Sequence, residues 1–188
     1  MLAPAIGRRV HVMGHSCAGK STLGSELAQA LSVPLVELDA LNWLPGWVGL
    51  SQTDPEELRR RIAAATTGDG WVLAGSYSDS VQPVCWDRLQ TVVWLDLPLL
   101  QLLWRMLRRS WQRWRSKELL WGTNYEKFWQ QLAFWRGEES LLWWIVSQYR
   151  PKQRHLVAIM ATPEYAHIRF IRLRSAREVL AFKTQLQL

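Results

Sequence analysis

The sequence predicts an α/β fold of three layers, in which helices cover both faces of a five-stranded parallel sheet. Strand-like apolar segments alternate along the chain with segments of helical periodicity, which is the order that a parallel sheet requires. Two of the predicted strands, residues 71–74 and 91–95, are continuous apolar runs, as expected of strands covered on both faces. The first predicted strand also leads directly into a glycine-rich loop and a helix.

The first half of the chain predicts two strands and two helices. Residues 9–13 alternate in polarity and predict the first strand, and residues 33–38 predict the second. Between them, residues 20–31 carry leucines at four-residue spacing, which indicates one buried helix face. Asp54 begins a second helix that runs to Thr66, because proline and two glutamates follow it in the positions typical of a capped first turn.

The second half continues the alternation. Residues 71–74 and 91–95 are the third and fourth strands, and a helix starts at Leu99 and continues past Arg115. Residues 168–173 predict the fifth strand. Residues 175–178 then read Ser-Ala-Arg-Glu, a capping box that opens a final helix. No repeat or linker interrupts the pattern, so residues 1–188 are expected to form one domain.

The composition excludes disordered and fibrous proteins, because 48% of the 188 residues are hydrophobic. There are 23 Lys plus Arg against 16 Asp plus Glu, a formal charge of +7. This surplus suits a nucleotide, a nucleic acid or a membrane surface, although a generally basic surface explains part of it. Cys17 and Cys85 are expected to be reduced thiols, and the four histidines lack the spacing of a zinc site. The longest apolar stretch, residues 91–104, contains Asp96 and is too short to span a bilayer. A cytoplasmic protein without a membrane partner is therefore expected.

The glycine-rich segment GHSCAGKS, residues 14–21, matches the pattern GxxxxGK[ST] in full. Its glycines permit a backbone path along which amide groups surround phosphate oxygens, and the helix that follows presents its positive end to the same anion. Lys20 is expected to reach the β- and γ-phosphates of ATP or GTP, and Ser21 to ligate Mg²⁺. The chain is thus predicted to have a P-loop NTPase fold. The residues expected to bind the nucleotide are Gly14, His15, Ser16, Cys17, Ala18, Gly19, Lys20, Ser21 and Thr22.

Two residues within this loop have chemistry of their own. His15 could contact a phosphate, but an exposed filler of the loop is the preferred interpretation. Cys17 lies at a helix N-terminus near Lys20, which should lower the pKa of its thiol and make it prone to alkylation rather than catalytic.

Phosphoryl transfer also needs an acid and further cations. Asp39 ends the second predicted strand and could accept a proton from a substrate hydroxyl or hold Mg²⁺ through water; the alternative is a turn or helix cap.

The helix after residue 98 has basic side chains and no acid. A helical wheel places its tryptophans on one face and Arg105, Arg109 and Arg113 on the other. The expectation is that the tryptophan face packs against the protein while the arginines meet anionic phosphates, and a solvated basic face is the alternative. Arginines beside aromatic side chains also suit nucleic acid, but tryptophans on the opposite face do not form a stacking platform with them. The basic residues of this segment are Arg105, Arg108, Arg109, Arg113, Arg115 and Lys117.

Together with the loop, the segments DALNWLPGW (39–47), WVLAGSY (71–77) and VVWLDLP (92–98) and the helix around residues 105–109 resemble the adenylate-kinase-related P-loop proteins often labelled "DNA topology modulation protein". The resemblance covers most of the chain. It implies a nucleotide-kinase-like fold with a helical region for the substrate after the second strand. It also implies a helical lid after the fourth strand, at about residues 99–150.

By this resemblance, Asp39, Trp43 and Tyr77 face the phosphate acceptor, and Arg105 and Arg109 begin the lid and clamp the transferring phosphate. Two departures stand out. Relatives usually have Asp-Gly-Asn-Tyr where this chain has Ala-Gly-Ser-Tyr from Ala74, which removes a carboxylate that could handle Mg²⁺. The lid segment at residues 119–126 is also longer and more aromatic than in relatives.

These features favour an ATP-dependent phosphotransferase that acts on a small nucleoside, nucleotide or hydroxylated metabolite. Two alternatives stay open: a nucleotide-regulated protein that binds nucleic acid, and a degenerate P-loop protein that binds nucleotide without transfer. Trp43 and Tyr77 could stack on the ring of an acceptor or form a hydrophobic wall. The tryptophan-rich residues 128–144 could form a lid core or the face of a homodimer.

Overall fold

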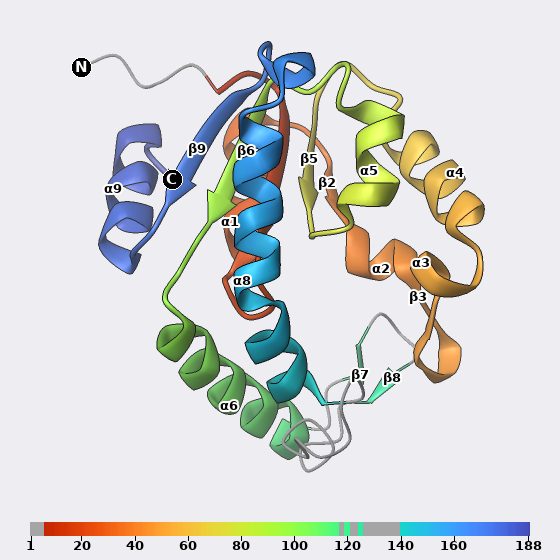
Figure 1. Ribbon diagram of the computed structural model, residues 1–188, viewed down its shortest axis with the longest axis vertical. Helices are drawn as coiled ribbons and strands as arrows, with labels where there is room; N and C mark the ends of the chain where they lie inside the picture. The colour runs from red at the N-terminus through yellow and green to blue at the C-terminus, as the bar shows by residue number, and fades with distance from the viewer. Residues whose placement is uncertain (1–5, 117–118, 121–123, 126–139) are drawn as a thin grey trace.

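The computed structural model describes residues 6–116, 119–120, 124–125 and 140–188, with a parallel five-stranded sheet at its centre (Figure 1). Its strands follow the order β2-β5-β1-β6-β9, and every neighbouring pair is parallel. The predicted sheet is therefore confirmed. Its strands are β1 (Arg9–Gly14), β2 (Leu35–Glu37), β5 (Trp71–Ala74), β6 (Thr91–Leu95) and β9 (Arg169–Leu173).

Strand β1 lies at the centre of the sheet, between β5 and β6. Its register pairs Val12 with Ala74 on one side and Val93 on the other, and its last residue, Gly14, pairs with Leu95. The strand order changes direction around β1, and in open parallel sheets ligands bind outside the carboxyl ends of the strands at such a point. The loop that follows Gly14 starts there.

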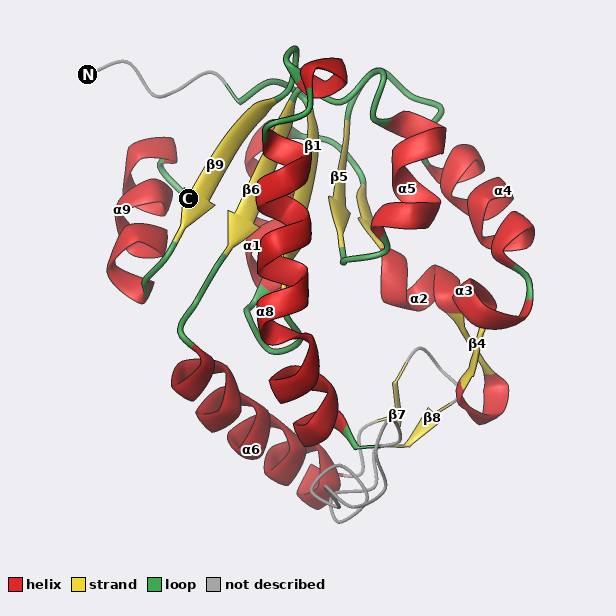
Figure 2. Cartoon of the chain, viewed as in Figure 1, coloured by secondary structure: helices red, strands yellow, loops and turns green. Residues whose placement is uncertain are grey.

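Helices form a layer on each face of the sheet (Figure 2). One layer contains α1 (Lys20–Leu31) and α9 (Ala176–Leu186); the other contains α4 (Pro55–Ala65), α5 (Ser78–Cys85) and the C-terminal half of α8 (Leu141–Met160). Helix α6 (Leu99–Ser116) extends from the end of β6 and packs against α8. The remaining short elements are α2 (Leu38–Asn42), β3 (Trp43–Leu44), η1 (Pro45–Trp47), β4 (Val48–Gly49), α3 (Leu50–Thr53), β7 (Leu119–Leu120), β8 (Asn124–Tyr125) and η3 (Pro163–Tyr165).

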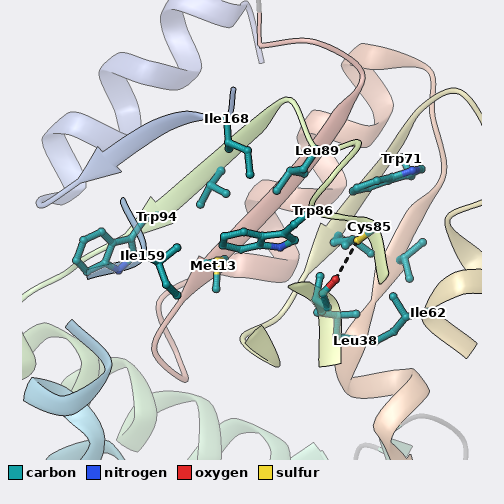
Figure 3. Packing of buried hydrophobic residues seen from close by; sticks show 14 of the residues in the cluster. Met13, Leu38, Ile62, Trp71, Cys85, Trp86, Leu89, Trp94, Ile159 and Ile168 are labelled. Carbon is teal, nitrogen blue, oxygen red and sulfur yellow. Dashed lines mark hydrogen bonds between the residues drawn. The ribbon is translucent and has the colours of Figure 1, made fainter. Parts of the chain in front are cut away.

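Three tryptophans form part of the core between the sheet and the α4–α5–α8 layer. Trp71, Trp86 and Trp94 are each at most 4% exposed, and Figure 3 shows them around Met13 of β1. Side chains of this size each bury about 150–250 Å² and dominate the apolar contribution to folding. They fix β1, and with it the start of the glycine-rich loop, against the layer of helices.

A polar contact inside this core ties three elements together. His11 of β1 accepts a hydrogen bond at Nδ1 from Trp86 Nε1 (3.3 Å), so its Nε2 carries the proton and donates to the Gly75 carbonyl (3.2 Å). Burial lowers the pKa of His11 to about 4, so the imidazole is neutral in the folded protein.

The predicted helix starts are confirmed by their hydrogen bonds. The Asp54 carboxylate accepts from the Glu57 amide at 3.0 Å, and the Ser175 hydroxyl accepts from the Glu178 amide at 3.2 Å. Strand β2 is shorter than predicted, because the chain turns into helix α2 at Leu38. Much of the predicted lid (about residues 99–150) and of the predicted homodimer face (128–144) lies outside the described residues, as does Lys117, whereas Trp143 and Trp144 lie in the first turn of α8.

Candidate functional site

The glycine-rich loop connects β1 to α1 through backbone conformations that favour glycine. Gly14 has φ 146°, and a Cβ added to it would lie 2.7 Å from the Leu95 carbonyl oxygen. Gly19 has φ 100° and stands at the N-terminus of α1. Any other residue at either position would be strained, and at Gly14 it would also collide with the neighbouring strand. The motif is thus used here for a tight strand–loop–helix turn at the centre of the sheet.

Lys20 is the first residue of α1, and its ammonium turns back over the loop. Nζ donates to the His15 carbonyl at 3.0 Å. Burial lowers the pKa of Lys20, and the positive charge of Arg109 lowers it further, while the negative charge of Asp39 opposes both. Lys20 therefore lies within electrostatic reach of an acid from α2 and a cation from α6. Residues Ser21 and Thr22, which follow it, are exposed in the first turn of α1.

Two arginines of α6 face the loop. Arg105 Nη1 donates to the Ala18 carbonyl at 2.9 Å and lies 3.6 Å from the position of a Cβ added to Gly19. Arg109 is partly buried, and its Nε has no hydrogen-bond partner within the described part of the chain. Arg105 therefore contacts the phosphate loop, whereas the role predicted for Arg109 stays a prediction.

The predicted packing of α6 is wrong in one respect. The tryptophan face was expected to pack inward, but Trp104 is 59% exposed and Leu100 is 81% exposed. The buried line of the helix is Leu102, Met106 and Ser110. Because the hydrogen bond from Arg105 to Ala18 holds the arginine side over the loop, the aromatic side turns outward. A helical wheel separates the two faces but does not say which one meets the protein.

The exposed-filler interpretation of His15 is also wrong, because His15 is only 6% exposed. Its Nε2 lies 3.1 Å from the carbonyl of Gln148 in α8, and its ring packs 5.7 Å from that of Tyr149. Burial, with a smaller contribution from Lys152, lowers the pKa of His15 to about 4. The neutral ring therefore donates from Nε2 to α8, so any contribution of His15 to nucleotide binding rests on its backbone.

Asp39 and Tyr77, which the resemblance placed toward the phosphate acceptor, contact each other beside the loop. The Tyr77 hydroxyl donates to Asp39 Oδ1 at 2.7 Å. Burial raises the pKa of Tyr77, and the negative charge of Asp39 raises it further, so the phenol stays protonated as a donor. Asp39 lies in the first turn of α2 rather than at the end of a strand. Because a carboxylate has two acceptor oxygens, Asp39 keeps Oδ2 as a second acceptor beside the one that Tyr77 uses.

Ser76 connects the Asp39–Tyr77 pair to the phosphate loop. Its hydroxyl donates to the Gly14 carbonyl at 2.5 Å and accepts from the Gly14 amide at 3.3 Å. Tyr77 follows directly in the sequence. The segment that departs from the resemblance at Ala74 therefore still holds the end of β5 against the end of β1.

The aromatic residues after α2 form a partly exposed wall. The Trp43 and Trp47 rings contact edge to face, with centroids 5.5 Å apart and planes at 73°. Asn42 beneath them is fully buried. Its Oδ1 accepts from the Ser51 amide at 2.8 Å, and its side-chain amide lies beside the Tyr77 hydroxyl. The wall thus consists of apolar rings over a buried amide.

Lys152 was not among the residues singled out from the sequence. It lies on α8, one turn beyond Gln148, and its Nζ stands 5.2 Å from the centre of the Trp144 ring. Burial and, to a smaller extent, the positive charge of Lys20 lower the pKa of Lys152 to about 8, while the negative charge of Asp39 opposes them. No motif marks this lysine; only the packing of α8 on the loop brings it to the site.

The donor set fits a nucleoside triphosphate with Mg²⁺. Lys20, Arg105 and Arg109 supply positive charge around the loop, and the buried Arg109 Nε is an unused donor. Among the described residues no group of three or more His, Cys, Asp or Glu could hold a metal ion. Magnesium bound with a nucleotide needs few protein ligands, because phosphates and waters supply the rest. The exposed Ser21 and the nearby Asp39 suit that arrangement.

The sheet and its loop define the class of the protein: an α/β fold of the P-loop type, with a nucleotide-kinase-like strand order. No helix in the described ranges is long and apolar enough to cross a membrane.

No family model matches the chain. It is 29% identical over 123 residues to the uncharacterized protein YqaC of Bacillus subtilis (strain 168), covering 64% of this chain and 66% of that protein. It is 32% identical over 114 residues to a shikimate kinase of Synechococcus sp. (strain JA-3-3Ab), covering 55% of this chain and 60% of that kinase. The chain thus spans less than two thirds of the length of either relative. Neither name mentions DNA topology, so that label stays an interpretation.

Similar solved structures include a gluconokinase from Sinorhizobium meliloti 1021, at 20% identity and a TM-score of 0.49, covering 96% of this chain and 94% of the other. A shikimate kinase from Acinetobacter baumannii has 18% identity and a TM-score of 0.48, and covers 96% of this chain and 92% of its own.

Proposed function

We propose that the protein transfers the γ-phosphoryl group of ATP to a hydroxyl group of a small molecule. One observation carries the proposal: charged side chains from α1, α2, α6 and α8 meet at the phosphate loop. The charges of Asp39 and Arg109 shift the pKa of Lys20, and the charges of Lys20 and Asp39 shift the pKa of Lys152. An acid among several cations, beside a glycine-rich turn, suits a reaction that depends on positioning and charge neutralisation.

Asp39 is the proposed proton acceptor. Its Oδ1 is bound by Tyr77, which leaves Oδ2 for the acceptor hydroxyl. In the transfer, the hydroxyl oxygen forms a bond to the γ-phosphorus while the bond from that phosphorus to the β–γ bridging oxygen breaks. The hydroxyl proton passes to Oδ2, and ADP leaves with the electron pair of the broken bond.

The cations are proposed to stabilise the negative charge of the phosphates. Lys20 would leave the His15 carbonyl for the β- and γ-phosphates, and Arg105 and Arg109 would approach from α6. Lys152 adds a fourth cation from α8. Magnesium ion, held through Ser21, would supply further neutralisation of phosphate charge.

The acceptor is proposed to be a small hydroxylated molecule that lies against Trp43 and Trp47. The two rings, packed edge to face and partly exposed, offer an apolar contact to a ring of the acceptor. A nucleoside, a nucleotide or a ring-shaped metabolite fits this description. The naming of one relative as a shikimate kinase supports the same broad class of acceptor.

The nucleic-acid alternative loses its main support, because Arg105 and Arg109 face the loop rather than an outer surface. The second alternative, a protein that binds nucleotide without transferring phosphate, is tested by measuring transfer directly.

The test is transfer from γ-labelled ATP with Mg²⁺ across nucleosides, nucleotides and hydroxylated metabolites. Labelled product is expected with the natural chain. It should fall by roughly 10³-fold with Lys20→Ala, because one electrostatic stabiliser of the transferring group is lost. Lys183→Ala is the matched control, since Lys183 of α9 pairs with Glu26 of α1 and is not among the proposed site residues, so transfer should stay intact. Binding of ATP without any labelled acceptor would support the degenerate alternative instead.

A further inference from the structure

The outward face of α6 carries an apolar stripe that the phosphate site does not use. Figure 1 shows α6 as the green helix along the lower left edge of the molecule. Its exposed apolar residues are 81% exposed at the start of the helix and still 44% exposed near its end. They recur at alternating four- and three-residue steps, so they lie along one line of the helix. We name this set the outer stripe: Leu100, Trp104, Leu107, Trp111 and Trp114.

The rim of the outer stripe is basic. Arg108 is exposed and its guanidinium lies 5.5 Å from the centre of the Trp104 ring, and Arg115 is exposed beside the end of the stripe. Helix α6 contains five arginines and no acidic residue. The whole chain carries a formal charge of +7. A partner of this face must therefore offer both an apolar region and negative charge.

We propose that the outer stripe binds the surface of an anionic lipid bilayer. A helix that lies in the interface plane places tryptophan and leucine among the acyl chains and headgroups, and arginine beside anionic headgroups. Tryptophan is the side chain most suited to that boundary, because its ring is apolar and its N–H is polar. The arginine that stacks on Trp104 can reach outward to a phosphate or carboxylate while its stem covers the ring.

Two other occupants fit less well. A second copy of this chain would place its own outer stripe here, and the arginines that flank the two stripes would repel each other. Nucleic acid would satisfy the arginines, but it offers no apolar region for Leu100 and Leu107. An anionic bilayer supplies both kinds of contact. This proposal does not depend on the proposed function, although Arg105 and Arg109 on the inner face of α6 would link the bilayer to the phosphate site.

The test is co-sedimentation of the full chain with vesicles of phosphatidylcholine alone and of phosphatidylcholine mixed with phosphatidylserine. Binding to the mixed vesicles is expected, with little binding to the neutral ones and a steep loss as salt is added. The double variant Leu100→Gln, Trp104→Gln should bind mixed vesicles at least roughly tenfold more weakly, since apolar area no longer leaves water. Arg108→Gln should weaken binding about fivefold, because one arginine near an anionic surface is lost.

Leu180→Gln is the matched control, because Leu180 is a single leucine on α9 that is 65% exposed and should not matter. ATP binding by each variant shows that the fold is kept. Equal binding to neutral and anionic vesicles would overturn the proposal. Unchanged binding of the double variant would overturn it as well. Self-association through α6, seen by analytical ultracentrifugation and removed by the double variant without any vesicle binding, would assign the stripe to a second copy and overturn the lipid surface.

Discussion

Lys152 and Lys20 are two like charges placed close together in a partly buried site. The positive charge of Lys20 adds to the effect of burial and lowers the pKa of Lys152 to about 8. Burial and a neighbouring positive charge both raise the free energy of an ammonium group, and a bound anion lowers it again. The pair therefore favours a ligand with several negative charges, such as the phosphates of a nucleotide.

The titration of Lys152 makes a prediction about the alkaline side of the pH profile. Because Lys152 loses its proton as the pH rises through about 8, kcat/KM for phosphoryl transfer should fall over that range. Lys152→Arg should keep the positive charge and move this fall to higher pH, since arginine does not deprotonate. Lys152→Ala should lower kcat/KM by roughly 10²-fold at neutral pH.

Arg154→Ala is the control for this experiment, because Arg154 is exposed on the same helix. A Lys152→Arg variant whose kcat/KM declines over the same pH range as the natural chain would contradict the role given to Lys152.

Asp39 is the proposed base, and Tyr77 positions its carboxylate through one hydrogen bond. Asp39→Asn removes the base while nearly keeping the shape, so kcat should fall by about 10²–10⁴-fold, with ATP affinity changed little. Tyr77→Phe removes only the hydrogen bond to Oδ1 and should lower kcat by roughly tenfold. Rapid-quench measurement of single-turnover transfer reports these rates directly. If Asp39→Asn weakened ATP binding but left the transfer rate unchanged, Asp39 would not be the base.

The core contact of His11 connects β1, the end of α5 and the residue after β5. This arrangement holds the two strand ends that carry the phosphate loop and the Ser76–Tyr77 segment. It requires a neutral imidazole, because a proton on Nδ1 would abolish the bond from Trp86. The folded protein should therefore lose stability at acidic pH.

The prediction concerns stability against pH. The folded pKa of His11, about 4, is below the ordinary 6.5, so only the unfolded chain takes up the proton between these values. The free energy of unfolding should therefore decrease as the pH falls from about 6.5 to about 4, by about 3 kcal/mol from this residue. His15, whose pKa is also lowered to about 4, acts in the same direction.

Urea unfolding at several pH values measures this slope. His11→Gln should reduce the slope between pH 6.5 and 4, even though its stability at neutral pH is also lower. The same slope in the variant and the natural chain would show that His11 is not the source.

The molecule as a whole follows the sequence-based prediction where local patterns are strong. The strand–loop–helix motif, the five parallel strands and the caps at Asp54 and Ser175 all recur in the structure, because each element is marked by a pattern within its own stretch of sequence. Helix α5 and the full length of α8 were not predicted. Each contains an internal proline, Pro83 or Pro151, which reads as a helix break although tertiary packing overrides it.

The site was harder to predict where it depends on contacts between distant segments. The hydrogen bond between Tyr77 and Asp39 was not predicted, although a resemblance placed both residues toward the acceptor. The contact of His15 with α8 and the approach of Lys152 join residues more than 100 positions apart, and no local pattern encodes them. The inward face of α6 was assigned wrongly, because hydrophobicity alone favoured the tryptophans over the hydrogen-bonded Arg105.

The central claim is that the charges around the phosphate loop catalyse transfer to an acceptor and do not merely bind nucleotide. The most direct measurement is the rate of ADP formation from ATP and Mg²⁺ with and without each candidate acceptor, in the natural chain and in Asp39→Asn. The account predicts that one acceptor class raises the rate by well over about tenfold and that Asp39→Asn removes the increase. A rate that no acceptor raises, or an increase that survives in Asp39→Asn, would contradict it.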